Sequence, residues 1–391
     1  MPGGPFSCLV PCSPAVVRRR LWCVSSSNSS VPVGLSVERI PVPVQLGDDA
    51  SEFQAFHGLD VAHQLELWGN RDRCPTLAEA AAFWRGSEYE ERQVFLAYLD
   101  GAVVGRGTLT LPLSENTTTA GVDVLVAAPF RRRGFGSAIL GVLEELARGR
   151  DRISFDGYCE EPLGPATERA RLLEAKSGTG GVPRDSASTL FALHHGFSLE
   201  QVETNSTLAF PVGEKILRDL EAEATQRAAG YSVIAWQDRC PDHLVDVFAR
   251  LKSLMSTEVP IAGLGWEGED WDAARVRQEE STWKSGGVDP VVAVARHDAT
   301  GELAAYTVLT HRPALPAVIY QEDTLVAPGH RGHRLGMLVK IANLRRAKEL
   351  WPDATSVMTW NANENRHMLA INIALGFKPS GFEGEWQKRL G

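Results

Sequence analysis

The sequence predicts two α/β domains in tandem, each with a central, mostly antiparallel mixed sheet flanked by helices. Helical and strand patterns alternate along nearly the whole chain, and one strand–loop–helix pattern occurs twice. Residues 124–136 correspond to residues 324–336, with Arg131 matching Arg331 and Gly136 matching Gly336 at a spacing of 200 (331 − 131). A repeat of this length indicates a duplicated domain.

A second pair of landmarks defines the domain boundaries. Leu-His-His-Gly-Phe at 193–197 resembles Ala-Leu-Gly-Phe at 374–377, at a spacing of 180 (377 − 197). The first copy therefore has 20 extra residues (200 − 180), and we place them in a Gly- and Pro-rich insertion at 160–185. The predicted organisation is a leader at 1–35, an N-terminal domain at 36–212 and a C-terminal domain at 213–391.

The leader differs in composition from the rest of the chain. It is rich in Ser and Pro, contains Arg18–Arg20, and has no acidic residue before Glu38. We expect it to be disordered, and a transit peptide is the alternative interpretation.

Within each copy, the pattern predicts a strand, two helices, a hairpin, a further strand, a long helix, a strand, a helix and short strands. A helix of suitable composition, Glu214–Ala229, would bridge the two copies. Helices are expected at Ala50–Trp68, Leu77–Arg85, Ser137–Ala147, His243–Met255 and Trp271–Trp283, and strands at Val122–Val126, Tyr320–Val326 and Ser356–Thr359.

Composition excludes several classes of function. The net charge of −9 leaves no domain with an overall basic face, so we expect no nucleic-acid partner. No apolar run approaches the roughly 18 residues that a membrane span needs, and we expect no membrane association. The six cysteines have neither zinc spacing nor a disulfide pattern, so no metal is predicted and the cytoplasm is the expected location. The sequence is compatible with a monomer or a homodimer.

The loop after Val122–Val126 indicates an anion site. It contains three consecutive arginines, Arg131–Arg133, followed by Gly134, Gly136 and a helix. Free N–H groups and the positive end of a helix dipole favour an anion at such a helix start. Several cationic groups on one small loop favour a pyrophosphate. The loop is not an ATP-type phosphate loop, because no Gly-Lys-Ser/Thr follows. It is not the dinucleotide-binding fingerprint either, because only two of the three glycines are present.

This loop, Arg131-x-x-Gly134-x-Gly136, resembles motif A of the GNAT (GCN5-related N-acetyltransferase) family, and the Leu-Gly-Phe ending resembles the end of GNAT motif B. The two copies together cover residues from about 37 to 390, which is nearly all of the chain after the leader. The chain is thus similar to tandem GNAT proteins, in a layout like that of mycothiol synthase and related actinobacterial acetyltransferases. The resemblance implies acetyl-coenzyme A as co-substrate and a small-molecule amine as acceptor.

The resemblance also implies which residues bind the coenzyme. In the second copy, Arg334 replaces the first glycine, and it would either weaken a left-handed backbone or reach a phosphate directly. The implied coenzyme-binding residues are Val124, Val126, Arg131, Arg132, Arg133, Gly134, Phe135, Gly136 and Ser137 in the first copy, and Val326, Arg331, Gly332, Arg334, Gly336 and Asn365 in the second. The tyrosine acid frequent in the family is absent, because its place is taken by Ala192 and Asn372.

Catalysis is predicted in the second copy. Glu322 is the first candidate for the general base and Asp323 the second, with strand alternation placing Tyr320 and Glu322 on one face and Asp323 on the other. Both carboxylates could equally be salt-bridge partners, and Tyr320 could protonate the leaving thiolate. The predicted reaction is direct acetyl transfer to a primary amine. An inactive coenzyme-A-binding scaffold is the alternative, and a transferase using aminoacyl-tRNA would need a basic groove that the sequence lacks.

Overall fold

The computed structural model describes residues 32–47, 50–168 and 171–390, and most of the predicted leader lies outside these residues. The first half contains β1 (Leu35–Ile40), α1 (Ser51–Trp68), α2 (Leu77–Trp84), β2 (Glu90–Leu99), β3 (Ala102–Pro112), β4 (Thr119–Val126), α3 (Phe135–Arg148), β5 (Ser154–Pro162), α4 (Pro165–Glu168), β6 (Leu172–Glu174), β7 (Gly181–Pro183), α5 (Ala187–His194) and β8 (Ser198–Ala209). The second half contains α6 (Glu214–Arg227), β9 (Tyr231–Gln237), α7 (Val245–Ser253), α8 (Met255–Glu258), α9 (Ala273–Gly286), β10 (Asp289–His297), β11 (Leu303–His311), β12 (Val318–Val326), α10 (Leu335–Leu350), β13 (Ser356–Ala362), α11 (Arg366–Leu375) and β14 (Lys378–Arg389).

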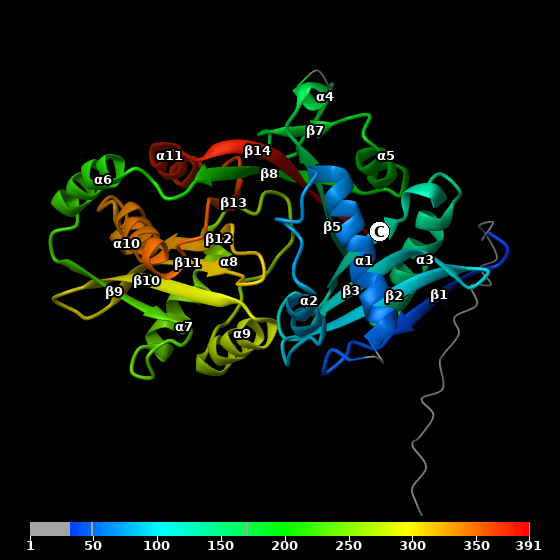
Figure 1. The fold of residues 1–391 in the computed structure, drawn as a ribbon, viewed down its shortest axis with the longest axis horizontal. Coiled ribbons are helices and arrows are strands. Elements are labelled where there is room, and N and C mark those ends of the chain that lie inside the picture. Colours follow the sequence, from blue (N-terminus) through cyan, green and yellow to red (C-terminus); the bar gives the residue numbers. More distant parts are fainter. Residues whose placement is uncertain (1–31, 48–49, 169–170, 391) are drawn as a thin grey trace, which may run out of the picture.

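The predicted mixed α/β fold is confirmed, and the two halves share one continuous sheet. Its twelve strands run in the order β1-β2-β3-β4-β5-β14-β8-β13-β12-β11-β10-β9. In Figure 1 the first half lies on the right and the second on the left, and β8 and β14 cross between them at the top. No described helix has the length and apolar character needed to cross a lipid bilayer.

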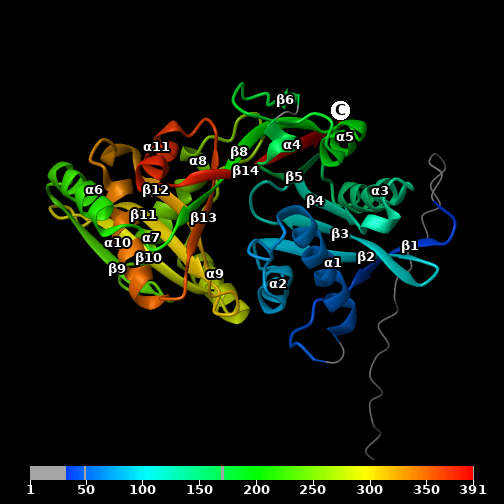
Figure 2. The same ribbon diagram turned by 45° about the horizontal axis from the view of Figure 1, so that its top comes forward.

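The halves exchange their last strands. β14, from the end of the second half, pairs with β5 of the first half along Gly381–Arg389. β8, from the end of the first half, pairs with β13 of the second half along Glu203–Ala209. β8 and β14 also pair with each other, at the junction that Figure 2 shows from above. Each copy was expected to end in short strands, but it ends in a single strand of 12 residues. The domain boundary at 212/213 stays a prediction.

The exchanged strand completes the hydrophobic core of the first half. Trp386 of β14 is 2% exposed and packs in the same cluster as Phe155 of β5 and Ile139 of α3. In the same strand, a Cβ at Gly381 would stand 2.5 Å from the Trp68 ring of α1, so only glycine allows this approach. The C-terminal segment is therefore part of the N-terminal core.

The helix predicted to bridge the halves packs instead on the second half. Leu217 and Ala224 of α6 are buried in the core cluster that contains Ile341 of α10. Arg345 of α10 also forms ion pairs of 2.8 Å with Glu214 and with Glu221 of α6.

We predict that Trp386→Ala destabilises the protein by about 3–5 kcal/mol, because it removes a large buried ring and leaves a cavity. Trp266→Ala is the matched control, since Trp266 is 40% exposed and should cost about 1 kcal/mol. Urea unfolding followed by fluorescence and circular dichroism measures both variants. Equal losses in the two variants would contradict the role assigned to β14.

Candidate active site

Two parallel strands separate in the first half and open a cleft. β4 and β5 pair only at Thr119–Gly121 and Ser154–Asp156. Beyond these pairs β5 continues as the partner of β14, and the backbone of Val122–Val126 has no strand on that side. A cavity of about 1360 Å³ occupies this region. Its lining includes Val124 and Val126 of β4 and Tyr158 and Cys159 of β5.

The loop after β4 closes one end of the cleft. Gly134 has φ of +85° and is the N-cap of α3, which confirms that this position has a left-handed backbone. After the amide of Arg131, the first amide along the chain that donates to a backbone carbonyl is that of Ala138, which donates to the Gly134 carbonyl over 3.1 Å. The N–H groups from Arg132 to Ser137 have no acceptor among the described residues. These amides form a set of donors at the start of a helix, which suits an anion.

The three arginines of this loop have different roles. Arg131 donates to the Val126 carbonyl over 2.9 Å and forms two hydrogen bonds, of 2.6 and 2.7 Å, with the Glu66 carboxylate of α1. Arg131 therefore anchors the loop to β4 and α1. Arg132 lines the cleft, and the Arg133 guanidinium lies 5.1 Å from the centre of the Phe135 ring. Neither has an ion pair with a described residue, and of the two only Arg132 lines the cavity.

The second loop repeats this geometry. Arg331 pairs with Glu258 of α8 over 2.6 Å, as Arg131 pairs with Glu66. Arg334 has φ of +56° at the N-cap of α10, so an arginine adopts the left-handed conformation that Gly134 has in the first copy. Its guanidinium forms an ion pair with Glu223 of α6. No residue of this loop lines the large cavity.

A buried ion triad supports the floor of the cleft. Arg106 of β3 donates to Asp60 of α1 over 2.6 Å and also pairs with Asp123 of β4. Burial alone would lower the pKa of Arg106, but the two carboxylates raise it above its ordinary value. Asp123 is thus held in an ion pair with a buried guanidinium.

The sequence did not single out His63, which lies beside this triad. His63 of α1 lines the cavity, and its Nδ1 is buried without a hydrogen-bond partner among the described residues. Burial lowers its pKa below the ordinary value, and the Arg106 charge acts in the same direction. Its imidazole is therefore neutral near pH 7 and has a free lone pair. A histidine on a helix gives no sequence signal of this kind, because its cleft position depends on tertiary packing.

The second half provides part of the cleft wall. Arg312 and Trp360 line the cavity, although they come from the end of β11 and from β13. Arg312 donates to Glu79 of α2 over 2.6 Å. The cleft therefore lies where both halves meet.

The three predicted catalytic residues lie on β12 at a bulge. Thr307 pairs with Thr324 and Leu309 with Gln321, so two residues of β12, Glu322 and Asp323, oppose one residue of β11.

Because of this bulge, both carboxylates contact the same face of β11. Glu322 accepts a hydrogen bond of 2.7 Å from Thr310, and Asp323 accepts one of 3.1 Å from Tyr306. The prediction from strict alternation, which separated Glu322 from Asp323, is therefore wrong.

Each of these residues already has a protein partner. Asp323 lies 3.5 Å from the Lys252 ammonium, and the Tyr320 hydroxyl donates to the Asp72 carbonyl in the first half. Their catalytic roles stay a prediction.

The motif B positions of the second copy are occupied by amide contacts. Asn365 caps α11, because its side chain accepts a hydrogen bond of 3.2 Å from the Met368 amide. Asn372 accepts a hydrogen bond of 3.1 Å from buried Lys340 and donates to Asn361 over 2.6 Å. Burial lowers the pKa of Lys340 to about 7.

Known proteins show the same architecture. Residues 61–163 match the model of the acetyltransferase (GNAT) family. The tandem GNAT protein from the clavulanic acid biosynthesis pathway, solved without AcCoA, is 26% identical over 91% of this chain and 99% of that chain, with a TM-score of 0.67. A GCN5-related N-acetyltransferase from Sphaerobacter thermophilus is 11% identical over 92% of this chain and 97% of that chain, with a TM-score of 0.59, which shows a likeness of fold. No curated protein sequence matches the chain.

The fold and the family model indicate an enzyme of the N-acetyltransferase type. More specifically, the chain has the tandem GNAT layout, and its first half contains the matched GNAT domain.

We predict that Arg106→Met lowers the free energy of unfolding by about 3 kcal/mol, because it leaves two carboxylates without their buried counter-charge. Arg150→Met is the matched control, since the Arg150 side chain is 47% exposed in its pair with Glu91 and should contribute less than about 1 kcal/mol. Chemical denaturation of both variants at pH 7 provides the comparison. An Arg106→Met variant as stable as the control would show that the triad is not a structural element.

Proposed function

We propose that the protein transfers an acetyl group from acetyl-coenzyme A to a primary amine of a small molecule, and that the first half binds the donor. The observation that carries this proposal is the position of the large cavity, which extends from the free amides of the first loop to the Arg106 triad. The pyrophosphate would accept hydrogen bonds from the amides of 132–137, with Arg132 and Arg133 adding charge. The thioester arm would then lie along the open side of β4.

His63 is the proposed base of this reaction. Its neutral imidazole accepts a proton from the acceptor nitrogen as that nitrogen attacks the thioester carbon. An N–C bond forms, a tetrahedral oxyanion follows, and the C–S bond then breaks to release coenzyme A. A backbone N–H of β4 near Val126 would stabilise the oxyanion. Tyr158 also lines the cleft, its side chain is 57% exposed, and its hydroxyl is the proposed proton donor to the leaving thiolate.

A separate hypothesis concerns a reaction in the second half. Glu322, Asp323 and Tyr320 stay our predicted catalytic residues for a reaction at the second loop, with Arg331, Gly332, Arg334, Gly336 and Val326 binding the donor there. An inactive scaffold that only binds coenzyme A is the remaining alternative. Release of free thiol from acetyl-coenzyme A in the presence of an amine panel separates an enzyme from a scaffold.

We predict that Arg131→Ala weakens acetyl-coenzyme A binding about tenfold or more, whereas Arg331→Ala changes it less than about twofold. The two residues are matched, because each anchors its loop through one glutamate, Glu66 or Glu258. Titration calorimetry of the wild type and both variants measures the number of sites and the affinity at each. A loss that appears only in Arg331→Ala would place donor binding in the second half.

We predict that kcat/KM falls as the pH drops below the pKa of His63, which lies below the ordinary value of 6.5. The sign follows from the proton balance, since the imidazolium formed at low pH can no longer accept a proton. His63→Gln should lose this acidic inflection and about 100-fold in rate, whereas His367→Gln, at an exposed position on α11, should keep both. Thiol-release assays from pH 5 to 9 test this. An acidic inflection retained by His63→Gln would exclude His63 as the base.

A further inference from the structure

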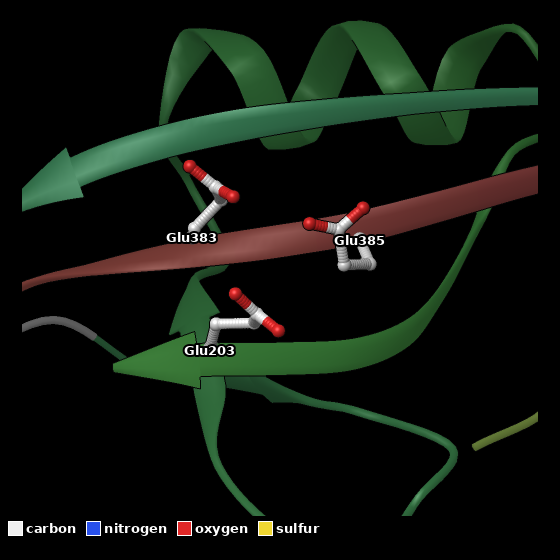
Figure 3. A group of neighbouring side chains, drawn as sticks. All are labelled: Glu203, Glu383 and Glu385. Atoms are coloured by element: carbon white, nitrogen blue, oxygen red, sulfur yellow. The ribbon is translucent and has the colours of Figure 1, made fainter. Parts of the chain in front are cut away.

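Three glutamates form a cluster at the junction of the halves. Glu203 of β8 and Glu383 and Glu385 of β14 have carboxylate oxygens that all lie within 4.8 Å of one another. Figure 3 shows the three side chains gathered over the two neighbouring strands. We call these residues the glutamate cluster.

The strand register adds more polar groups to the same face. Glu383 is the direct partner of Glu203 in β8 and of Glu160 in β5. Asn205 lies two residues after Glu203 and donates to Glu160 over 3.4 Å. Side chains two residues apart on a strand share a face, so five polar groups meet on one side of the sheet.

The glutamate cluster has no cation in direct contact among the described residues. No described residue donates an ion pair to any member of the glutamate cluster. Arg73 is the cation at its edge, where its Nε lies 3.9 Å from Glu160. Glu364, whose charge acts on Glu203, has both carboxylate oxygens buried without a partner among the described residues. Burying carboxylates without counter-charge is costly, so the site favours an added cation.

The pKa values respond to this imbalance. Burial, followed by the Glu364 charge, raises the pKa of Glu203 to about 7. Burial and the Glu203 charge raise the pKa of Glu385 to about 8, although a hydrogen bond with Glu383 acts in the opposite direction. Burial and the Glu385 charge raise the pKa of Glu383 well above its ordinary value. A cation bound among these carboxylates would lower these pKa values again.

A buried amide also points to a ligand at this face. Asn205 is 0% exposed, and its Oδ1 has no hydrogen-bond partner among the described residues. Its Nδ2 faces Glu160, which places this amide beside the glutamates. An unused buried acceptor next to carboxylates suits an N–H donor, because an acceptor of this kind is rarely left unsatisfied.

The glutamate cluster connects with the proposed active site. Glu383 belongs to the glutamate cluster and also lines the large cavity. Its neighbour Glu160 lines the same cavity. On the α1 side, Trp68 and Gln64 donate to Glu160 over 3.3 and 3.4 Å. A ligand in the cleft therefore meets the glutamate cluster at Glu383.

We propose that the acceptor is an organic polycation, one amine of which is acetylated while a second positive group is held by Glu203, Glu383, Glu385 and Asn205. This inference rests on the proposed function. An ammonium group suits the cluster, because its N–H donors reach oxygens at about 2.7–2.9 Å, which lets two such oxygens stand up to about 5 Å apart.

The experiment compares a monoamine with di- and triamines of increasing length. Binding is measured by calorimetry without donor on the wild type and on the variants named below, and turnover by thiol release with acetyl-coenzyme A. We expect kcat/KM to be at least tenfold higher for a di- or triamine than for the monoamine. The double variant Glu203→Gln/Glu385→Gln should reduce this preference to about twofold. Glu145→Gln, at an exposed position on α3, is the control and should retain the preference.

Three outcomes would overturn the proposal. One is equal binding of mono- and polyamines by the wild type, and another is a full preference for polyamines in the double variant. The third is a metal site. It would be identified if millimolar Ca²⁺ or Mg²⁺ raised the melting temperature of the wild type but not of the double variant, and polyamines raised neither. The binding measurement does not need turnover. Polyamine binding that depends on the cluster without any thiol release would therefore support the cation site while contradicting the transferase activity.

Discussion

The exchange of β8 and β14 is the constraint on which the rest of the structure depends. β5 pairs with β4 only as far as Asp156, whereas its opposite edge pairs along Ser154–Pro162 with β14, which arrives from the far end of the chain. Because β14 holds β5 in the sheet along its whole length and Trp386 fills the core beneath it, β5 can diverge from β4, and the facing edges of these two strands line the cleft. The cleft of the first half is thus held open by a strand of the second.

The two copies share a loop geometry but differ in what surrounds it. Each loop is tied by an arginine to a glutamate of a preceding helix, and each helix begins at a left-handed residue, Gly134 or Arg334. On the strand before the loop, Arg106 pairs with Asp123 in the first copy, whereas Tyr306 and Lys252 contact Asp323 in the second. The backbone determines the loop, and the side chains determine whether an accessible cleft adjoins it.

Local chemistry made much of this fold predictable from the sequence. Periodicity predicted α1 and α3 to within a few residues, and the duplicated Gly-containing loop predicted the strand–loop–helix unit. The bulge at Glu322 and Asp323 was not predictable, because it depends on pairing with β11. The one extra residue brings Asp323 to the same face as Glu322. His63 and the glutamate cluster were also missed. The cleft around His63 and the glutamate cluster are each assembled from segments far apart in the chain, so no local pattern identifies them.

The position of Tyr320 shows how closely the two copies depend on each other. Its hydroxyl donates to the Asp72 carbonyl in the turn between α1 and α2, and its ring stacks on Trp360 with centres 5.6 Å apart. The Arg312 guanidinium lies 4.0 Å from the centre of the same ring and pairs with Glu79. These contacts place the middle of β12 against the helices that cover the first cleft, and Trp360 and Arg312 become part of its wall. A side chain of the second copy near Tyr320 therefore influences the acceptor end of the first, whichever loop binds the donor. A duplicated domain that shares strands and a cleft wall is constrained as one unit, and its second copy supports the first cleft although its own loop does not line that cleft.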